Sequence, residues 1–320
     1  MLLSKTPLRI SFAGGGSDYF NENSDVKGRV IVTTINKYMH VILNKKYNSS
    51  VRVSYSKTEN VNTVNEIKHQ IIRQSLKNYN IINGVEVVTV ADIPTSGSGL
   101  ASSSALTVGL VNILNKFKDQ TITKKILAQE ACKIEIIKCK KLIGMQDQYS
   151  TAYGGLNRIE FYNKKVTVKK IELSNQFMNK FNNHLHLFHT GINRQANDIL
   201  LNIKKSGNQF INYDKLAYLA KNFEKELFLK NLDACGEILN ENWMIKKKLD
   251  QSVSSLNLDN IYDDAKSAGA IGGKLLGAGG GGYFLFLSKP QNKNRLIKKL
   301  KRLQHIDFKF TQNGSEVIKI

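Results

Sequence analysis

Cysteine is scarce in this sequence, with three residues in 320, at positions 132, 139 and 235. So few cysteines argue against a disulfide-stapled secreted scaffold and favour free thiols in a reducing compartment. Long apolar runs are also absent, because no segment reaches the roughly 20 apolar residues that a membrane-spanning helix needs. The first residues, Met1–Ile10, contain no signal-peptide hydrophobic region. Together these absences predict a cytoplasmic protein with no membrane partner.

Acidic residues are few beside basic ones, with 26 Asp and Glu against 47 Lys and Arg, and the formal net charge is +21. Such a charge suits a nucleic acid, an acidic membrane or a polyanionic small substrate. The basic residues are mostly scattered Lys, with one local cluster at Lys298–Arg302 and no basic stripe interleaved with aromatics. Only the net charge supports a nucleic-acid partner, and no other feature of the sequence does, so we expect no nucleic-acid partner. We interpret the charge as a Lys-rich solvated surface with some phosphate-binding positions.

Strand-like and helix-like segments occur in both halves of the chain, without internal repeats or a long low-complexity linker. We expect strands at residues 8–13, 29–55, 85–91, 156–173, 184–189, 283–287, 306–310 and 315–320. We expect helices at residues 64–79, 103–117, 123–141, from 145, 194–250, 259–268 and 293–303. This mixture predicts an α+β protein. An interruption at 175–180 predicts an N-terminal domain of residues 1–177 and a C-terminal domain of residues 178–320.

A glycine- and serine-rich segment, Pro94–Ala105, joins a strand-like run to a helix-like run. The first backbone N–H groups of a helix lack partners, and together with the helix dipole they form an anion site. Gly97 and Gly99 leave room for a bulky anion, and the serines at 98, 102, 103 and 104 add hydroxyls. This combination predicts a cradle for a triphosphate. The alternative is a serine-rich N-cap on an ordinary helix.

Two further segments place carboxylates beside glycine. Pro7–Tyr19 reads as a strand ending in three glycines, followed by Asp18, which either accepts hydrogen bonds from sugar hydroxyls or caps a tight turn. In Gly144–Gln148, Asp147 falls in the first turn of a helix, and Glu135 lies on the preceding helix. Phosphoryl transfer needs a carboxylate near the attacking hydroxyl and oxygen ligands for Mg²⁺. These two acids either divide those roles or are solvated surface residues.

A second glycine-rich segment, Gly272–Gly282, precedes an apolar strand. It is not a Walker A loop, because Leu275 and not Ser or Thr follows Lys274. Gly277–Gly282 matches G-x-G-x-x-G, but it lies before a strand and not between a strand and a helix, so a dinucleotide site is out of context. We predict a loop that closes over the nucleotide or the substrate. The alternative is a flexible hinge.

In this order, the segments resemble the three motifs of the GHMP small-molecule kinase family, and the resemblance covers nearly the whole chain. The central motif, ending in G-S-G-L-x-S-S-S, is matched between Pro94 and Ser104. The resemblance implies an N-terminal domain like domain 2 of ribosomal protein S5 and a ferredoxin-like C-terminal domain. It also implies ATP and Mg²⁺ as cofactors, with the ligands in the cleft between the domains.

The resemblance also implies roles for individual residues. Catalysis is expected from Asp147 and Arg9, and the metal ligands are expected to be Ser103 and Glu135. The expected ATP-binding residues are Pro94, Gly97, Ser98, Gly99, Leu100, Ala101, Ser102, Ser103 and Ser104. The expected substrate-binding residues are Gly15, Gly16, Ser17, Asp18, Arg194, Gly277, Gly279 and Gly280.

Within the family, residues 11–19, 34–38, 144–155 and 190–194 most resemble members that act on D-glycero-D-manno-heptose 7-phosphate. This implies a sugar kinase that phosphorylates the anomeric O1 and yields the 1,7-bisphosphate, for nucleotide-activated heptose and surface polysaccharide. The alternatives are a fucokinase-like kinase of an unphosphorylated sugar and a non-catalytic sugar sensor on the same fold. Arg194, and after it Lys274, is the candidate partner of the substrate's phosphate, because a guanidinium suits bidentate binding. The oligomeric state stays open.

Overall fold

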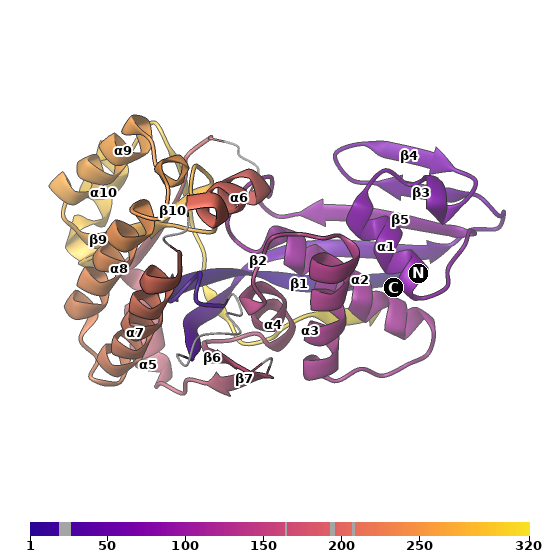
Figure 1. The fold of residues 1–320 in the computed structure, drawn as a ribbon, viewed down its shortest axis with the longest axis horizontal. Coiled ribbons are helices and arrows are strands. Elements are labelled where there is room, and N and C mark those ends of the chain that lie inside the picture. Colours follow the sequence, from indigo (N-terminus) through magenta and orange to yellow (C-terminus); the bar gives the residue numbers. More distant parts are fainter. Residues whose placement is uncertain (19–26, 164, 193–195, 207–208) are drawn as a thin grey trace.

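The computed structural model describes residues 1–18, 27–163, 165–192, 196–206 and 209–320. Arg194, predicted to bind substrate, lies outside the described residues. A large sheet with its helices forms one part of the molecule, and a smaller sheet with further helices forms the other (Figure 1). The prediction of an α+β protein is confirmed.

The large sheet is mostly antiparallel and is built around two long strands from the start of the chain. Its main path runs β13-β1-β2-β5-β3-β4, with β12 and β6 also paired to β2 and β7 paired to β6. Only the β3–β5 pair is parallel among the described strands. The strands are β1 (Leu2–Ala13), β2 (Gly28–Lys45), β3 (Val51–Ser54), β4 (Thr58–Val61), β5 (Val85–Ala91), β6 (Asn157–Tyr162), β7 (Lys165–Lys170), β12 (Phe310–Thr311) and β13 (Glu316–Lys319).

One helix of this part is central to the site because it is buried along most of its length. It is α2 (Ser102–Phe117), which packs against β1 and β2, and its buried residues run from Ser104 to Val111 without a break. The other helices here are α1 (Gln70–Asn78), α3 (Lys124–Cys132) and α4 (Gln146–Tyr153). A buried helix is held at a fixed depth, so its N-terminus is presented at a defined place.

The smaller sheet has the order β11-β8-β10-β9, and its strands pair antiparallel. Its apolar core includes Trp243, Phe284 and Phe286. The strands are β8 (Leu185–His189), β9 (Ala270–Leu275), β10 (Tyr283–Ser288) and β11 (Gln304–Ile306). The helices are α5 (Asn175–Asn183), α6 (Ala196–Ser206), α7 (Gln209–Phe228), α8 (Leu232–Lys247), α9 (Leu256–Ser267) and α10 (Lys293–Lys299).

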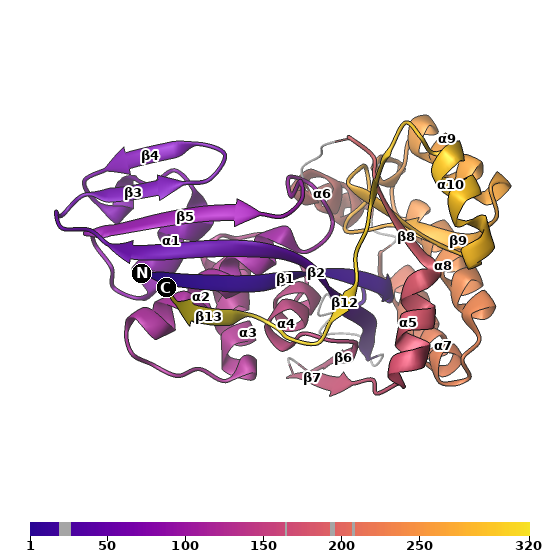
Figure 2. The ribbon, with the colours of Figure 1, turned by 180° about the vertical axis from the view of Figure 1, so that it is seen from behind.

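The end of the chain returns to the large sheet, as Figure 2 shows for β12 and β13. Leu2 pairs with Lys319, so the two termini lie side by side. A cluster of aromatic rings joins the two parts where β1 ends. The Phe12 ring lies 5.1 Å from Phe181, 5.3 Å from Phe223 and 6.3 Å from Phe310. This packing fixes the end of β1 against the second part, while the domain boundary at 177/178 stays a prediction.

Several expected elements differ from the structure, including the strand expected at 306–310, which is interrupted between β11 and β12, and the helix expected at 293–303, which ends at Lys299. The helix expected at 64–79 is a 3₁₀ turn, Val64–Glu66, followed by α1. The helix expected at 123–141 is α3, which is capped by the Thr123 side chain and continues into a π-helical turn at Lys133–Lys138. The glycine-rich loop expected from 272 begins later, because Gly272 and its neighbours form β9. A Cβ at Gly272 would lie 1.9 Å from the Gly236 carbonyl oxygen of α8, so this glycine permits close packing and is not a hinge.

No helix among the described residues is long and apolar enough to cross a bilayer. The three cysteines are free, as predicted, and all three are buried. Burial raises the pKa of the Cys235 thiol to about 12, so this side chain is an apolar packing residue and not a nucleophile.

A buried histidine of the smaller sheet makes stability depend on pH. His186 lies in β8, and its Nε2 is 3.0 Å from the Ser288 hydroxyl. Burial, followed by the nearby His305 and Lys293, lowers the pKa of His186 from 6.5 to about 4. Between these values the unfolded chain binds more protons than the folded one. The unfolding free energy should therefore fall by up to about 3 kcal/mol as pH drops from 6.5 to 4 because of this group.

Denaturant unfolding of the protein and of a His186→Gln variant between pH 7 and pH 4 measures this effect. The variant should show a shallower loss of unfolding free energy over that interval. Parallel pH profiles would contradict a neutral buried imidazole at this position.

Candidate active site

The predicted triphosphate cradle is the connection from β5 to the first turn of α2. Ala101 adopts a left-handed backbone conformation, with φ of 62°, immediately before the helix. Ala105 donates its N–H to the Ala101 carbonyl oxygen at 2.8 Å. Within the described residues, the N–H groups of Ser102, Ser103 and Ser104 have no protein acceptor. A helix start that presents three such donors is suited to an anion.

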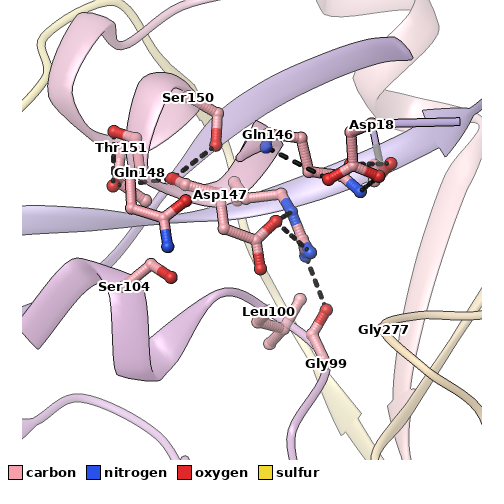
Figure 3. Close-up of polar contacts among 12 residues, drawn as sticks. Asp18, Gly99, Leu100, Ser104, Gln146, Asp147, Gln148, Ser150, Thr151 and Gly277 are labelled. Atoms are coloured by element: carbon pink, nitrogen blue, oxygen red, sulfur yellow. Dashed lines mark hydrogen bonds and ion pairs between the residues drawn. The ribbon is translucent and has the colours of Figure 1, made fainter. Parts of the chain in front are cut away.

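An ion pair between β1 and α4 lies beside the cradle. Arg9 donates to Asp147 Oδ1 through Nε at 2.9 Å and through Nη2 at 2.6 Å. Its third contact is a hydrogen bond from Nη1 to the Gly99 carbonyl oxygen, 2.6 Å away. Figure 3 shows the Asp147 carboxylate directed toward Gly99. The predicted catalytic pair is therefore assembled, and Arg9 connects the carboxylate to the cradle.

Glu135 is fully buried at the π-helical turn, and both oxygens of its carboxylate accept hydrogen bonds. Oε2 accepts from the Ser104 hydroxyl at 2.6 Å and from Gln148 Nε2 at 2.7 Å. Oε1 accepts from the Ser103 hydroxyl and from the Lys141 ammonium, the latter at 2.9 Å. Lys141 also donates to the Ser103 hydroxyl. A cation thus already bridges the two predicted metal ligands.

Asp18 is bound to α4, so the two predicted acidic segments, Pro7–Tyr19 and Gly144–Gln148, meet. Its Oδ1 accepts from the Gly16 N–H and from Gln146 Nε2, both at 3.0 Å, and its Oδ2 accepts from the Gln146 N–H at 3.2 Å. Burial, followed by the charge of Asp147, raises the pKa of Asp18. Figure 3 shows Gln146 turned toward Asp18, on the side of α4 away from Ser104. Gln146 is thereby the residue that positions Asp18.

Gly144 leaves room for this contact. A Cβ at Gly144 would lie 2.0 Å from Asp18 Oδ2, whereas a Cβ at Gly15 would lie 3.4 Å or more from its nearest neighbours. Gly144→Ala should therefore displace Asp18 and lower the unfolding free energy by about 1–3 kcal/mol, the usual range for overpacking. Gly15→Ala is the matched control and should leave stability nearly unchanged. Denaturant unfolding of both variants measures the difference, and equal stabilities would contradict the assigned contact.

The second part of the molecule forms the opposite wall. Lys274 of β9 is buried and donates to the Phe12 carbonyl oxygen at 3.1 Å, and Lys246 of α8 donates to the Gly277 carbonyl oxygen. The glycine-rich loop is held by its backbone, since the Gly280 N–H donates to the Val253 carbonyl oxygen at 2.8 Å. The hydroxyl of Tyr283 donates to the Pro94 carbonyl oxygen at 3.0 Å and ties β10 to the cradle.

These elements enclose one cavity of about 420 Å³. The predicted site residues that line it are Arg9, Gly15, Gly16, Asp18, Gly97, Ser98, Gly99, Ala101, Ser102, Ser103, Ser104, Asp147 and Gly277. The described ones that do not line it are Pro94, Leu100, Ser17, Glu135, Gly279 and Gly280. Of these, Glu135 lies behind the cavity wall and accepts hydrogen bonds from the Ser103 and Ser104 hydroxyls. Gly280 donates its N–H to the Val253 carbonyl oxygen.

Several lining residues were not assigned to the site from the sequence. Lys141, Gln146, Tyr213 and Lys246 line the cavity, but sequence reasoning assigned none of them to the site. In a chain with 47 basic residues, an isolated lysine at 141 or 246 does not stand out. Gln146 lies inside the recognised motif Gly144–Gln148, so of these four residues it is the one that the sequence could have assigned to the site.

Comparison with known proteins finds related sequences and structures. Residues 62–155 match the family model for the GHMP kinases N terminal domain, and residues 219–305 match that for GHMP kinases C terminal. The chain is 30% identical to D-glycero-alpha-D-manno-heptose 7-phosphate kinase of Campylobacter jejuni, with 97% of each chain covered. A crystal structure of a putative sugar kinase from Campylobacter jejuni has 28% identity and a TM-score of 0.81, over 100% of this chain and 98% of that one. A D-glycero-D-manno-heptose 1-phosphate kinase from Bacteroides thetaiotaomicron shares the fold, with a TM-score of 0.82 and 22% identity over 100% and 99%.

Proposed function

This chain belongs to the GHMP kinase family, and within that family we propose that it phosphorylates the anomeric O1 of D-glycero-D-manno-heptose 7-phosphate. Membership confirms two predictions, the two-domain GHMP kinase fold and an ATP-dependent sugar kinase. The choice of sugar, the hydroxyl that reacts and the roles of individual residues are the proposal.

The charge of the cavity is the observation that supports an acceptor with its own phosphate. Among the described lining residues, four are cationic and two are anionic: Arg9, Lys141, Lys246 and Lys274, against Asp18 and Asp147. A cavity of about 420 Å³ with this excess suits more anionic charge than a neutral sugar brings. The 30% identity with a heptose 7-phosphate kinase over 97% of both chains points to the same class of acceptor.

The nucleotide phosphates fit the cradle. The three backbone N–H groups without described acceptors at Ser102–Ser104 supply donors, and the α2 dipole favours negative charge there. Arg9 lies at the junction of the cradle and Asp147, where charge on the transferring phosphoryl group would be stabilised. We therefore place the nucleotide's phosphates along α2 and the acceptor on the Asp147 side.

Asp147 is the group that receives the acceptor hydroxyl. Both hydrogen bonds from Arg9 go to Oδ1, and among the described residues Oδ2 has no hydrogen-bond donor. Oδ2 is therefore available to accept the anomeric O1–H. As O1 forms its bond to the phosphorus, Asp147 takes the proton and the leaving nucleotide keeps the bridging oxygen. Arg9 holds the carboxylate in this orientation throughout.

The residues also fit a divalent cation. The Lys141 ammonium bridges Ser103 and Glu135, so this oxygen pair already holds positive charge in the structure. A hydroxyl and a buried carboxylate are hard oxygen ligands of the kind that Mg²⁺ prefers. We propose that Ser103 and Glu135 hold Mg²⁺, which would neutralise phosphate charge when bound.

A panel of acceptors tests the proposed function. With ATP, the kcat/KM for heptose 7-phosphate should exceed that for heptose, fucose, galactose and mevalonate, by roughly 10- to 100-fold over heptose for one charge-assisted contact. Phosphorus NMR of the product should show a phosphate on the anomeric carbon. Equal kcat/KM for heptose and heptose 7-phosphate would contradict the proposal and favour the fucokinase-like alternative. The non-catalytic sensor has less support, because Arg9, Asp147, Ser103 and Glu135 come together at one site.

A further inference from the structure

Two lysines of the cavity wall, Lys246 and Lys274, are more deeply buried than lysines normally are. The relative solvent exposure is 7% for Lys246 and 2% for Lys274. Each donates to a backbone carbonyl, Lys246 to Gly277 and Lys274 to Phe12. Within the described part of the chain, no carboxylate is paired with Lys274. A buried ammonium without an anion is costly, so its presence at a cavity wall points to a ligand that supplies the missing charge.

The electrostatic situation of Lys274 supports this reading. Burial, followed by the charges of Lys246 and Arg9, lowers its pKa well below the ordinary value. Repulsion from Lys246 and Arg9, which also line the cavity, therefore disfavours the charged form of Lys274. A dianion placed among them removes that repulsion, whereas a neutral sugar does not.

The position of the two lysines assigns them to the acceptor side. Lys274 donates to the carbonyl oxygen of Phe12, near the end of β1 and two residues before Gly14. One helical turn before Lys246, Asn242 of α8 accepts the Gly14 N–H through Oδ1 at 3.2 Å. Helix α8 thus binds the turn before Asp18 through Asn242 and, one helical turn later, places Lys246 in the cavity wall. The Ser102–Ser104 turn belongs to α2, and the cradle meets this wall at Gly99, which lies beside Gly277.

We propose that Lys246 and Lys274 form a subsite for the phosphate monoester that the acceptor sugar already carries. This inference rests on the proposed function of a phosphosugar kinase. The sugar would extend from Asp147 and Asp18, at its reacting end, to the two lysines, at its phosphorylated end. Arg194 lies outside the described residues, and the subsite requires no contribution from it.

Neutral substitutions of similar length test the subsite. In Lys246→Met and Lys274→Met, the KM for heptose 7-phosphate should rise roughly 10- to 100-fold while the KM for ATP changes little. The kcat/KM for unphosphorylated heptose should stay near that of the unmodified enzyme. Lys247→Met is the matched control, because Lys247 is the next residue of α8, pairs with Asp259 at 3.0 Å and does not line the cavity. It should leave every constant unchanged.

A binding measurement separates this inference from the choice of sugar. Calorimetry with heptose 7-phosphate, mannose 6-phosphate and fructose 6-phosphate, each beside its parent sugar, reports recognition of the phosphate without turnover. If another sugar phosphate binds best and loses affinity in both variants, the subsite stands and the heptose proposal fails. If heptose 7-phosphate is phosphorylated with unchanged KM in both variants, the function stands and the subsite is overturned.

Two further outcomes are decisive. A rise in the KM for ATP, without one for the acceptor, would assign the lysines to the nucleotide and overturn the inference.

Melting temperature gives an independent readout. Lys274→Met removes an unpaired buried charge, so it should raise the melting temperature of the ligand-free protein and abolish most of the stabilisation by sugar phosphate. Should Lys274→Met fail to fold, Lys246→Met decides the question alone.

Discussion

Asp147→Asn is expected to lower kcat by roughly 10²- to 10⁴-fold, the usual contribution of a positioned general base. The amide removes the group that takes the proton from the anomeric hydroxyl. The change preserves an oxygen that can accept from Arg9, which now donates to Oδ1 at 2.9 and 2.6 Å. Nucleotide affinity should stay close to that of the unmodified enzyme. Steady-state kinetics together with nucleotide titration measures both quantities.

Two companion variants make this prediction specific. Asp147→Glu keeps the charge but displaces the carboxylate by one methylene, so it should fold normally and still lose much of kcat, because reacting groups must be closely aligned. Asp92→Asn changes an acid near the surface, which binds the Tyr38 N–H at 2.9 Å, and should keep full activity. A near-normal kcat in Asp147→Asn, with the fold intact, would remove Asp147 from the mechanism.

Glu135→Gln is expected to raise the Mg²⁺ concentration needed for half-maximal rate, and Ser103→Ala should do so to a smaller degree. The carboxylate brings the only negative charge that contacts Ser103, Ser104 and Lys141 among the described residues, whereas the serine brings a neutral hydroxyl. Loss of a charged ligand should weaken metal binding by roughly 10-fold or more. Initial rates over a magnesium series, and Mn²⁺ binding followed by electron paramagnetic resonance, give two independent readouts.

Glu130→Gln is the matched control for this experiment. Glu130 lies on α3, one and a half turns before Glu135, and forms a surface ion pair with Lys133 at 3.8 Å. It should leave the magnesium requirement and Mn²⁺ binding unchanged. If Glu135→Gln and Ser103→Ala also leave both readouts unchanged, Ser103 and Glu135 are not the metal ligands.

In the glycine-rich segment Gly272–Gly282, the sequence did not predict which glycines belong to a strand and which to turns. Its glycines predicted one loop that closes over the ligand, yet Gly272 belongs to strand β9 and faces the Gly236 carbonyl of α8. The same residue type serves close packing at one end of the segment and left-handed turns at the other, as at Gly277 with φ of 76°. Sequence alone does not separate the two uses, because both require only the absence of a side chain.

The sequence by itself determined the family and the α+β class, and it predicted the cradle. The cradle could be recognised because its parts are contiguous: a strand, two glycines and a helix start that leaves N–H groups unpaired all lie between residues 85 and 105. Arg9 and Asp147 came from the resemblance, and the structure joins them across 138 positions of the chain.

Tertiary structure alone decided which side chains meet. It brings Gln146 onto Asp18 across 128 positions and Lys274 onto the Phe12 carbonyl across 262. It also buries Lys246 and Lys274 in the wall of one cavity, in a chain whose other lysines are mostly at the surface. The sequence does not distinguish a buried lysine from an exposed one. Burial, neighbouring charge and the shape of the cavity arise only when α8 and β9 pack against the end of β1.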